Sequence, residues 1–151
     1  MTYRLRPATI ADVHVIARTL RPADLAEIEA LGLDPVQAIR ANFRQSVFRV
    51  AAVTDHELVA VGGLVGSMLS DFGYPWLVTA PGIETIPVSF VKEARAVVTQ
   101  MLSIKKRLEG YVAADYRGAC RLIEVLGFTL DEPFPFGPKA ALFRHYSMGR
   151  A

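Results

Sequence analysis

The sequence contains a single cysteine, Cys120, among 151 residues. One cysteine cannot form an intramolecular disulfide, which is typical of a protein kept in a reducing compartment. Cys120 lies inside a helical pattern with no histidine nearby in the sequence. We therefore interpret it as a small buried apolar residue and not as a nucleophile.

Long apolar runs and an excess of one charge are also missing. The longest apolar run, 58–65, is too short to span a bilayer, and the N-terminal MTYRLRP lacks the apolar core of a signal peptide. We therefore expect a soluble cytoplasmic chain. A net charge of +2 gives no case for nucleic-acid binding. The densest basic run, 105–107, is interpreted as the solvated end of a helix.

The three histidines show no metal-ligand spacing and no cysteine or carboxylate cluster around them, so we expect no metal site. His56 falls in a predicted turn and is expected to be solvated. His145 falls on the last predicted strand, where it would face either a groove or solvent. We favour solvent for His145.

Hydrophobic residues make up 52% of the chain, enough for the core of one domain over residues 1–151. The periodicity predicts a helix behind a capping box at Thr9–Asp12 and further helices at 23–31, 35–45, 87–102 and 117–126. Strands are predicted at 2–6, 47–53, 58–65, 76–79, 108–113 and 140–147, with loops at 67–75 and 131–138. The mixture predicts an α/β (α+β) domain with helices packed on one sheet.

Two features of the predicted sheet point to a close approach or a cleft. Gly62 and Gly63 lie within a strand, where glycine indicates a bulge or a group lying against the backbone. Trp76 follows Tyr74 and Pro75 at the start of the central strand. This aromatic cluster is either core packing at a sheet edge, which we favour, or the wall of a ligand cleft.

The segment Leu108–Phe128 reads LEGYVAADYRGACRLIEVLGF, a strand, a short connection and an amphipathic helix closed by Leu-Gly-Phe. It resembles the second half of the acetyl-CoA-dependent N-acyltransferases of the GNAT family. The resemblance implies a single GNAT-like domain, with a mixed central sheet, helices on both faces, and a splay between two parallel strands, 76–79 and 108–113. Acetyl-CoA would enter that splay, lined by backbone at Val78 and Thr79 and by side chains of Asp115 and Tyr116.

The chain departs from the GNAT pattern where coenzyme A phosphates would bind. Of the glycines expected after the central strand only Gly82 is present, Pro81 and Pro87 each lack an N–H donor, and Glu84 adds negative charge. Ile123 stands where the family often has the tyrosine that protonates the leaving thiolate, and isoleucine has no proton to give. These departures predict a degenerate site that binds acetyl-CoA weakly.

Candidate proton-handling residues follow from the same resemblance. Tyr116 or Tyr111 is a candidate substitute for the missing tyrosine. Glu27, on a predicted helix with Asp24 and after Arg21, is a candidate general base for an amine. The alternative, which we favour, is that these carboxylates form the acidic first turn of a surface helix.

A narrower resemblance runs along the chain, through the pieces 20–24, 27–28, 75–77, 95, 122–128, and 136–137 before 143. It is to GNAT-like proteins encoded among the virion-assembly genes of T7-like phages and prophages. It implies phage virion or assembly proteins as partners and a location in the host cytoplasm or virion, and it is compatible with a homodimer.

Three functions therefore remain open. The hypothesis we favour is a virion-associated or virion-assembly protein with a degenerate acetyl-CoA site. The alternatives are an active acetyl-CoA-dependent N-acetyltransferase on a small-molecule or protein amine, and a module that binds an acyl-CoA-like or other ligand without turnover.

Overall fold

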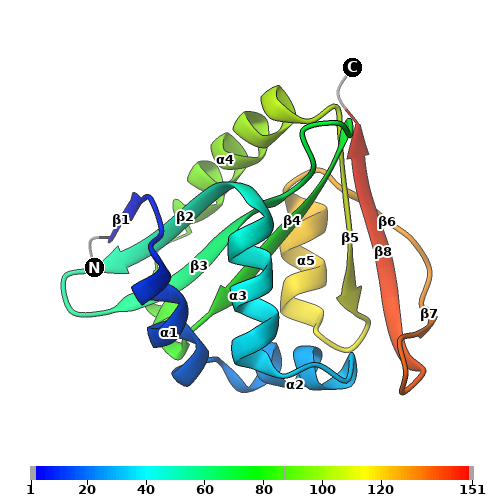
Figure 1. The fold of residues 1–151 in the computed structure, drawn as a ribbon, viewed down its shortest axis with the longest axis horizontal. Helices are drawn as coiled ribbons and strands as arrows, with labels where there is room; N and C mark the ends of the chain where they lie inside the picture. Colours follow the sequence, from blue (N-terminus) through cyan, green and yellow to red (C-terminus); the bar gives the residue numbers. More distant parts are fainter. Residues whose placement is uncertain (1–2, 87, 150–151) are drawn as a thin grey trace.

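The computed structural model describes residues 3–86 and 88–149. Within these ranges one sheet has the order β1-β2-β3-β4-β5-β8-β6, with β7 also paired to β8 (Figure 1). The strands are β1 (Tyr3–Arg6), β2 (Ser46–Thr54), β3 (Leu58–Val65), β4 (Phe72–Thr79), β5 (Arg107–Ala113), β6 (Thr129–Leu130), β7 (Phe134–Phe136) and β8 (Ala141–Gly149). The helices are α1 (Ile10–Arg18), α2 (Pro22–Ala30), α3 (Pro35–Gln45), the 3-10 helix η1 (Pro81–Thr85), α4 (Phe90–Ile104) and α5 (Arg117–Val125).

The predicted starts of α1 and α3 are confirmed, whereas α4, predicted from residue 87, begins at Phe90. Thr9 and Asp12 form the capping box of α1, and the Asp12 carboxylate also binds Arg6 at 2.7 Å. The Arg6 guanidinium holds the pKa of Asp12 below its usual value. Asp34 accepts a hydrogen bond from the Gln37 N–H at 3.0 Å and caps α3. Two residues that begin predicted elements, Thr2 and Pro87, lie outside the described residues.

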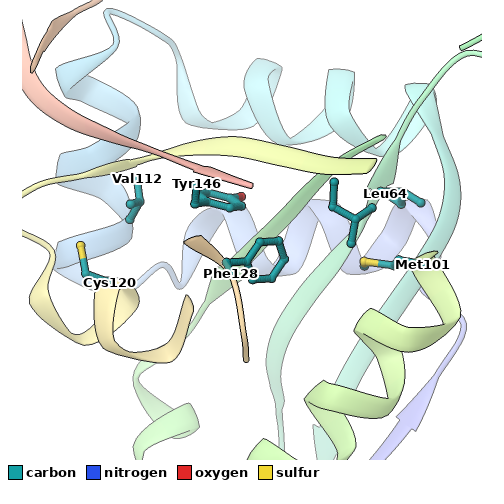
Figure 2. Packing of buried hydrophobic residues seen from close by; sticks show 7 residues of the cluster. Leu64, Met101, Val112, Cys120, Phe128 and Tyr146 are labelled. Carbon is teal, nitrogen blue, oxygen red and sulfur yellow. The ribbon is translucent and has the colours of Figure 1, made fainter. Parts of the chain in front are cut away.

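Helices cover both faces of the sheet, as predicted (Figure 1). On one face α1 and α3 pack through Val13, Ile16 and Ile39 against β3 and β4. On the other face α4 and α5 pack through Met101 and Cys120 against β5, around the cluster in Figure 2. Cys120 is a buried free thiol, as expected from its apolar surroundings, and burial raises its pKa.

The strands β4 and β5 are parallel and pair only at Phe72–Arg107 and Gly73–Leu108. Beyond these pairs they diverge, and Figure 1 shows α2 near their separated ends. The predicted splay is therefore present. Tyr146 of β8 lies over Gly110, where a Cβ would overlap the Tyr146 hydroxyl, and donates a hydrogen bond to the Pro75 carbonyl at 3.2 Å. Tyr146 thus ties β8 to β4 across β5.

The structure corrects two predicted loops. Residues 72–75 belong to β4, although Pro75 has no N–H. The Pro75 carbonyl points toward Tyr146 and the splay, so the missing N–H on the same side of the strand costs no bond to β3. Residues 134–136 form β7, whose Pro135 is tolerated because β7 pairs with β8 alone.

Gly63 has the close contact predicted for a strand glycine. A Cβ there would lie 3.0 Å from the Trp76 indole nitrogen, which donates to the Ser46 hydroxyl at 2.8 Å. The glycine therefore leaves room for the Trp76 indole nitrogen to reach Ser46, the C-cap residue of α3.

The prediction that residues 105–107 are a solvated helix end is wrong for Lys105. Its side chain is buried, and its ammonium donates to the carbonyls of Ser67 and Ser70, the latter at 2.6 Å. Lys105 thereby holds the loop between β3 and β4. The reason is that the Lys105 stem packs against Gly66 and Gly73, where a Cβ would lie 2.9 Å from it, so its ammonium reaches the loop carbonyls.

Replacing Lys105 by methionine is expected to destabilise the protein by about 2 kcal/mol, because two charge-assisted hydrogen bonds are lost while the apolar stem is kept. Urea unfolding measures the change. The neighbouring Lys106→Met is the control, since Lys106 is 65% exposed and 3.9 Å from the Asp71 carboxylate. Equal effects of the two substitutions would contradict a structural role for Lys105.

Candidate active site

Helix α2 bridges the separated ends of β4 and β5. The carboxylate of Asp24 accepts hydrogen bonds from the Thr79 N–H at 2.8 Å and from the Thr79 hydroxyl. One turn later, the carboxylate of Glu27 accepts the Ala113 N–H at 2.9 Å. The Arg21 N–H, just before α2, donates to the Thr79 carbonyl at 2.8 Å. Because residues three apart share a helix face, α2 caps both strands at once.

The favoured interpretation of Asp24 and Glu27 as an acidic surface turn is therefore wrong. Asp24 is buried and Glu27 is half-buried. Both carboxylates face the sheet because the last amides of the two splayed strands lack a neighbouring strand and need acceptors. That demand arises only from the tertiary arrangement.

Glu27 has the electrostatics of a proton acceptor. Burial raises its pKa to about 7, and the carboxylates of Asp24 and Asp115 add to the rise. The Ala113 N–H acts in the opposite direction. A carboxyl group that titrates near neutral pH is suited to take a proton from a reacting group.

Tyr116 is the N-cap residue of α5 and is half-buried at the same place. Burial raises its pKa to about 12, and the hydroxyl also interacts with the Asp24 carboxylate and with the Thr79 hydroxyl. The Arg21 guanidinium lies 3.5 Å from the Tyr116 oxygen. Tyr116 is therefore a protonated hydroxyl at neutral pH, able to donate a hydrogen bond into the site.

The negative charge that Glu84 brings to the predicted phosphate turn is partly balanced. The Arg21 guanidinium lies 3.2 Å from the Glu84 carboxylate, whose side chain is 68% exposed. A solvated carboxylate paired with a guanidinium repels a bound anion less than the sequence alone suggests. Packing explains why residue 82 is a glycine, because a Cβ there would overlap the Glu57 carboxylate.

A cavity of about 760 Å³ passes between β4 and β5. One part of its lining, with Val97, Met101 and Ile123, belongs to the face covered by α4 and α5. Another part, with Ile28, Ile39 and Trp76, belongs to the face covered by α1 and α3. The cavity thus has walls on both faces of the sheet.

The structure brings most of the predicted site residues to this cavity. Glu27, Val78, Thr79 and Tyr116 line it, whereas Gly82 and Asp115 are not among its lining residues. Asp115 is exposed on the turn before α5. The predicted pair Glu27 and Tyr116 is linked by the Asp24 carboxylate, which interacts with both.

Two site features were missed from the sequence. Residues of β4 alternate in backbone direction: the Pro75 carbonyl and the Thr79 N–H face the gap, whereas the Ala80 N–H donates to the Val59 carbonyl of β3. Val78 is in phase with Ala80, so its backbone faces β3, and the predicted backbone contact of Val78 in the cleft is wrong. Leu77, midway between Pro75 and Thr79, therefore directs its N–H and carbonyl into the gap. The other is Asp24, whose buried carboxylate organises Thr79 and Tyr116. The strand pattern contains the alternation but does not say which edge of β4 is unpaired.

His145 is not the solvated side chain that we predicted. Its ring lies 3.4 Å from the Glu109 carboxylate and 3.1 Å from that of Asp131, and 5.3 Å from the Tyr111 ring centroid. Among the described residues no group of three or more potential metal ligands is found. The part of the chain that the structure describes also has no helix long and apolar enough to cross a bilayer.

No family model and no curated protein sequence matches the chain. Solved structures do match. A GNAT-family acetyltransferase from Bacillus anthracis superposes with a TM-score of 0.69 and 12% identity, over 99% of this chain and 95% of that one. This chain has the GNAT fold. A phosphinothricin acetyltransferase from Sinorhizobium meliloti gives a TM-score of 0.70 at 14% identity, over 99% and 89% of the two chains.

An aminoglycoside acetyltransferase, AAC(6')-Ib, gives a TM-score of 0.69 at 14% identity, over 99% of this chain and 94% of that one. Identities this low show the fold alone. These GNAT-fold neighbours are acetyltransferases, and they give no support to the predicted membership of the phage virion-assembly family. A virion role and phage partners thus rest on the short sequence pieces only.

Proposed function

We propose that the protein is an acyl-CoA-dependent N-acyltransferase that acts on an amine, the second of the three functions considered from the sequence. The observation that supports this best is Glu27. Its half-buried carboxylate, with a pKa raised to about 7, lies at the mouth of the gap between the splayed strands.

The gap between β4 and β5 fits an acyl-CoA molecule. Its cavity extends under α4 and α5, and Leu77 directs its N–H and carbonyl into it, where an extended amide chain can pair. Acetyl-CoA would supply an acetyl thioester there. The Sinorhizobium meliloti neighbour is described in complex with acetyl-CoA, and AAC(6')-Ib in complex with ribostamycin and coenzyme A.

The residues around the gap have complementary proton roles. Glu27 takes the proton that an alkylammonium must lose before its nitrogen can attack a carbonyl carbon. Tyr116, protonated because its pKa is about 12, offers its proton to the departing sulfur and regains one from the new amide nitrogen. Asp24 positions these groups, because its carboxylate interacts with the Tyr116 hydroxyl and accepts hydrogen bonds from Thr79. Tyr116 would thereby replace the tyrosine absent at Ile123, as the sequence comparison with GNAT suggested.

Acetyl-CoA is expected to bind with a Kd below about 100 μM by calorimetry, and an amine panel is expected to release free thiol. Leu77→Pro is the informative variant, because it removes the Leu77 N–H, which faces the gap, just as Pro75 lacks an N–H two residues earlier. We expect it to weaken binding about tenfold, the worth of one hydrogen bond. Leu77→Ala, which keeps the N–H, is the control.

Two outcomes would contradict the proposal. Absence of binding at millimolar acetyl-CoA would favour the hypothesis that the acetyl-CoA site is degenerate. Binding without thiol release for any amine would favour a module that holds the ligand without turnover.

A further inference from the structure

We propose that the acceptor is a primary amine with a single positive charge and an aromatic or branched apolar body, such as an arylalkylamine. This inference rests on the proposed function and specifies its substrate. It comes from the lining of the cavity on the face of the sheet opposite α4 and α5, which we call the acceptor chamber.

The chamber walls are mostly aromatic and aliphatic. They are formed by Leu31 after α2, Tyr74 and Trp76 of β4, Tyr111 of β5, and Phe136 of β7. Trp76 packs in the cluster under α1 and α3, and Val112 in the cluster under α4 and α5. Since neighbours on a strand face opposite sides, Tyr111 points away from α4 and α5, as does Trp76.

The rings at the far wall are held in a fixed arrangement. The Tyr111 and Phe136 rings are stacked, with centroids 4.3 Å apart and an interplanar angle of 15°. Phe134 contacts Tyr111 edge-on with centroids 6.1 Å apart. The turn after β7 packs on the end of α2, where a Cβ at Gly137 would lie 3.4 Å from a Leu31 methyl group. The wall is therefore preformed and presents ring surface, which favours a flat apolar partner.

The charges of the cavity lining match one ammonium group. The carboxylates among the described lining residues are Asp24 and Glu27, and the cation is Arg21. Asp24 is already engaged by the N–H and hydroxyl of Thr79. Glu27 is therefore the carboxylate left for a substrate cation, while Arg21 repels a second positive charge. A polyamine or an amino sugar with several ammonium groups would leave charges unpaired in the chamber.

The apolar walls of the chamber also disfavour an amine whose body is strongly hydrophilic. A hydroxyl-rich acceptor would exchange water for ring faces and aliphatic groups, and each polar group left without a partner there weakens binding. An aryl group in that place gains apolar burial against Tyr111 and Phe136. The chamber walls thus select amines with an apolar body, and Glu27 selects amines with one positive charge.

Trp76 gives a test that does not depend on turnover, because it is the only tryptophan of the chain and lines the chamber. Phenethylamine, spermidine and glucosamine are titrated while Trp76 fluorescence is recorded, with and without acetyl-CoA, and calorimetry is run in parallel. We expect phenethylamine to change the fluorescence saturably and to bind at least about tenfold more tightly than either other amine.

Variants locate the binding surface. Tyr111 is 45% exposed, so Tyr111→Ala is expected to leave the fold intact. We expect Tyr111→Ala to weaken phenethylamine binding about tenfold, and to raise KM with little change in kcat if acetyl transfer occurs. Tyr111→Phe should restore binding, because the ring and not the hydroxyl makes the wall. Val15→Ala, a partly exposed apolar truncation on α1, is the control.

The outcomes separate this inference from the proposed function. Tighter binding of spermidine or glucosamine than of phenethylamine, or no response to phenethylamine in either measurement, overturns the acceptor class even if acetyl transfer to another amine is found. Saturable phenethylamine binding that is lost in Tyr111→Ala supports the chamber, and if no acetyl transfer accompanies it, the proposed function alone fails.

Discussion

Replacing Glu27 by glutamine is expected to lower kcat/KM for acetyl transfer by about 100-fold to 10,000-fold, the range contributed by a positioned general base. Glutamine keeps an oxygen to accept the Ala113 N–H, so the end of β5 remains capped. It cannot take a proton from the ammonium. In the unmodified protein kcat/KM should rise with pH and level off above an apparent pKa of about 7, because Glu27 acts only when ionised.

The same substitution is expected to stabilise the protein at alkaline pH. The pKa of Glu27 is raised from 4.5 to about 7 by folding, so the folded state favours the protonated form. The stability that comes from this preference for the protonated carboxyl group is fully present below pH 4.5 and is lost as pH rises through about 7. Glu27→Gln should therefore match the unmodified protein near pH 4 and exceed it by up to about 3 kcal/mol near pH 8.

Thiol-release kinetics and urea unfolding across this pH range measure both effects on the same preparations. Glu29→Gln is the matched control, since Glu29 is exposed on the same helix and neither effect is expected there. A Glu27→Gln protein with an unchanged rate, or with its stability gain at acid pH, would contradict the role given to this carboxylate.

Replacing Asp24 by alanine is expected to destabilise the protein by about 3 kcal/mol, because the buried N–H and hydroxyl of Thr79 lose a charged acceptor. Acetyl transfer is expected to fall as well, since Asp24 also interacts with the Tyr116 hydroxyl. Urea unfolding near pH 7 gives the stability, and thiol release the rate.

Asp24→Asn separates geometry from charge. The asparagine oxygen can take the place of the one carboxylate oxygen that accepts both the Thr79 N–H and the Thr79 hydroxyl, so most of the stability should be retained. Leu25→Ala, on the exposed side of α2, is the control for loss of a side chain from this helix. If Asp24→Asn were as destabilising as Asp24→Ala, the hydrogen bonds described for Thr79 would not be what holds α2 on the sheet.

Much of the fold could be predicted from local patterns. The capping box at Thr9 and the proline after Asp34 predicted where α1 and α3 begin, because a helix start is determined by residues within one turn. The order of strands and helices, and the resemblance of 108–128 to GNAT, predicted helices on both faces and a splay. Strand β4 was predicted too short because Pro75 ordinarily ends a strand, and only the gap beside it makes a proline acceptable.

The candidate site could be predicted only in part. Tyr116 was named from its position in a GNAT-like pattern and Glu27 from its spacing to Asp24 and Arg21, but the favoured interpretation of Glu27 as a surface residue was wrong. The sequence of α2, with its acidic first turn after Pro22, is indistinguishable from that of a solvated helix. Similarly Lys105 was assigned to solvent because nothing local shows that the carbonyls of Ser67 and Ser70 lie beside it.

By itself the sequence determined the elements, their order and the apolar faces that pack them into one domain, since these depend on spacing along the chain. Only the tertiary structure decided that Asp24 and Glu27 cap two strands that have separated, 55 and 86 residues away along the chain. The physical reason is that burial and unpaired backbone amides arise from the divergence of β4 and β5. They raise the pKa of Glu27 only after the chain has folded.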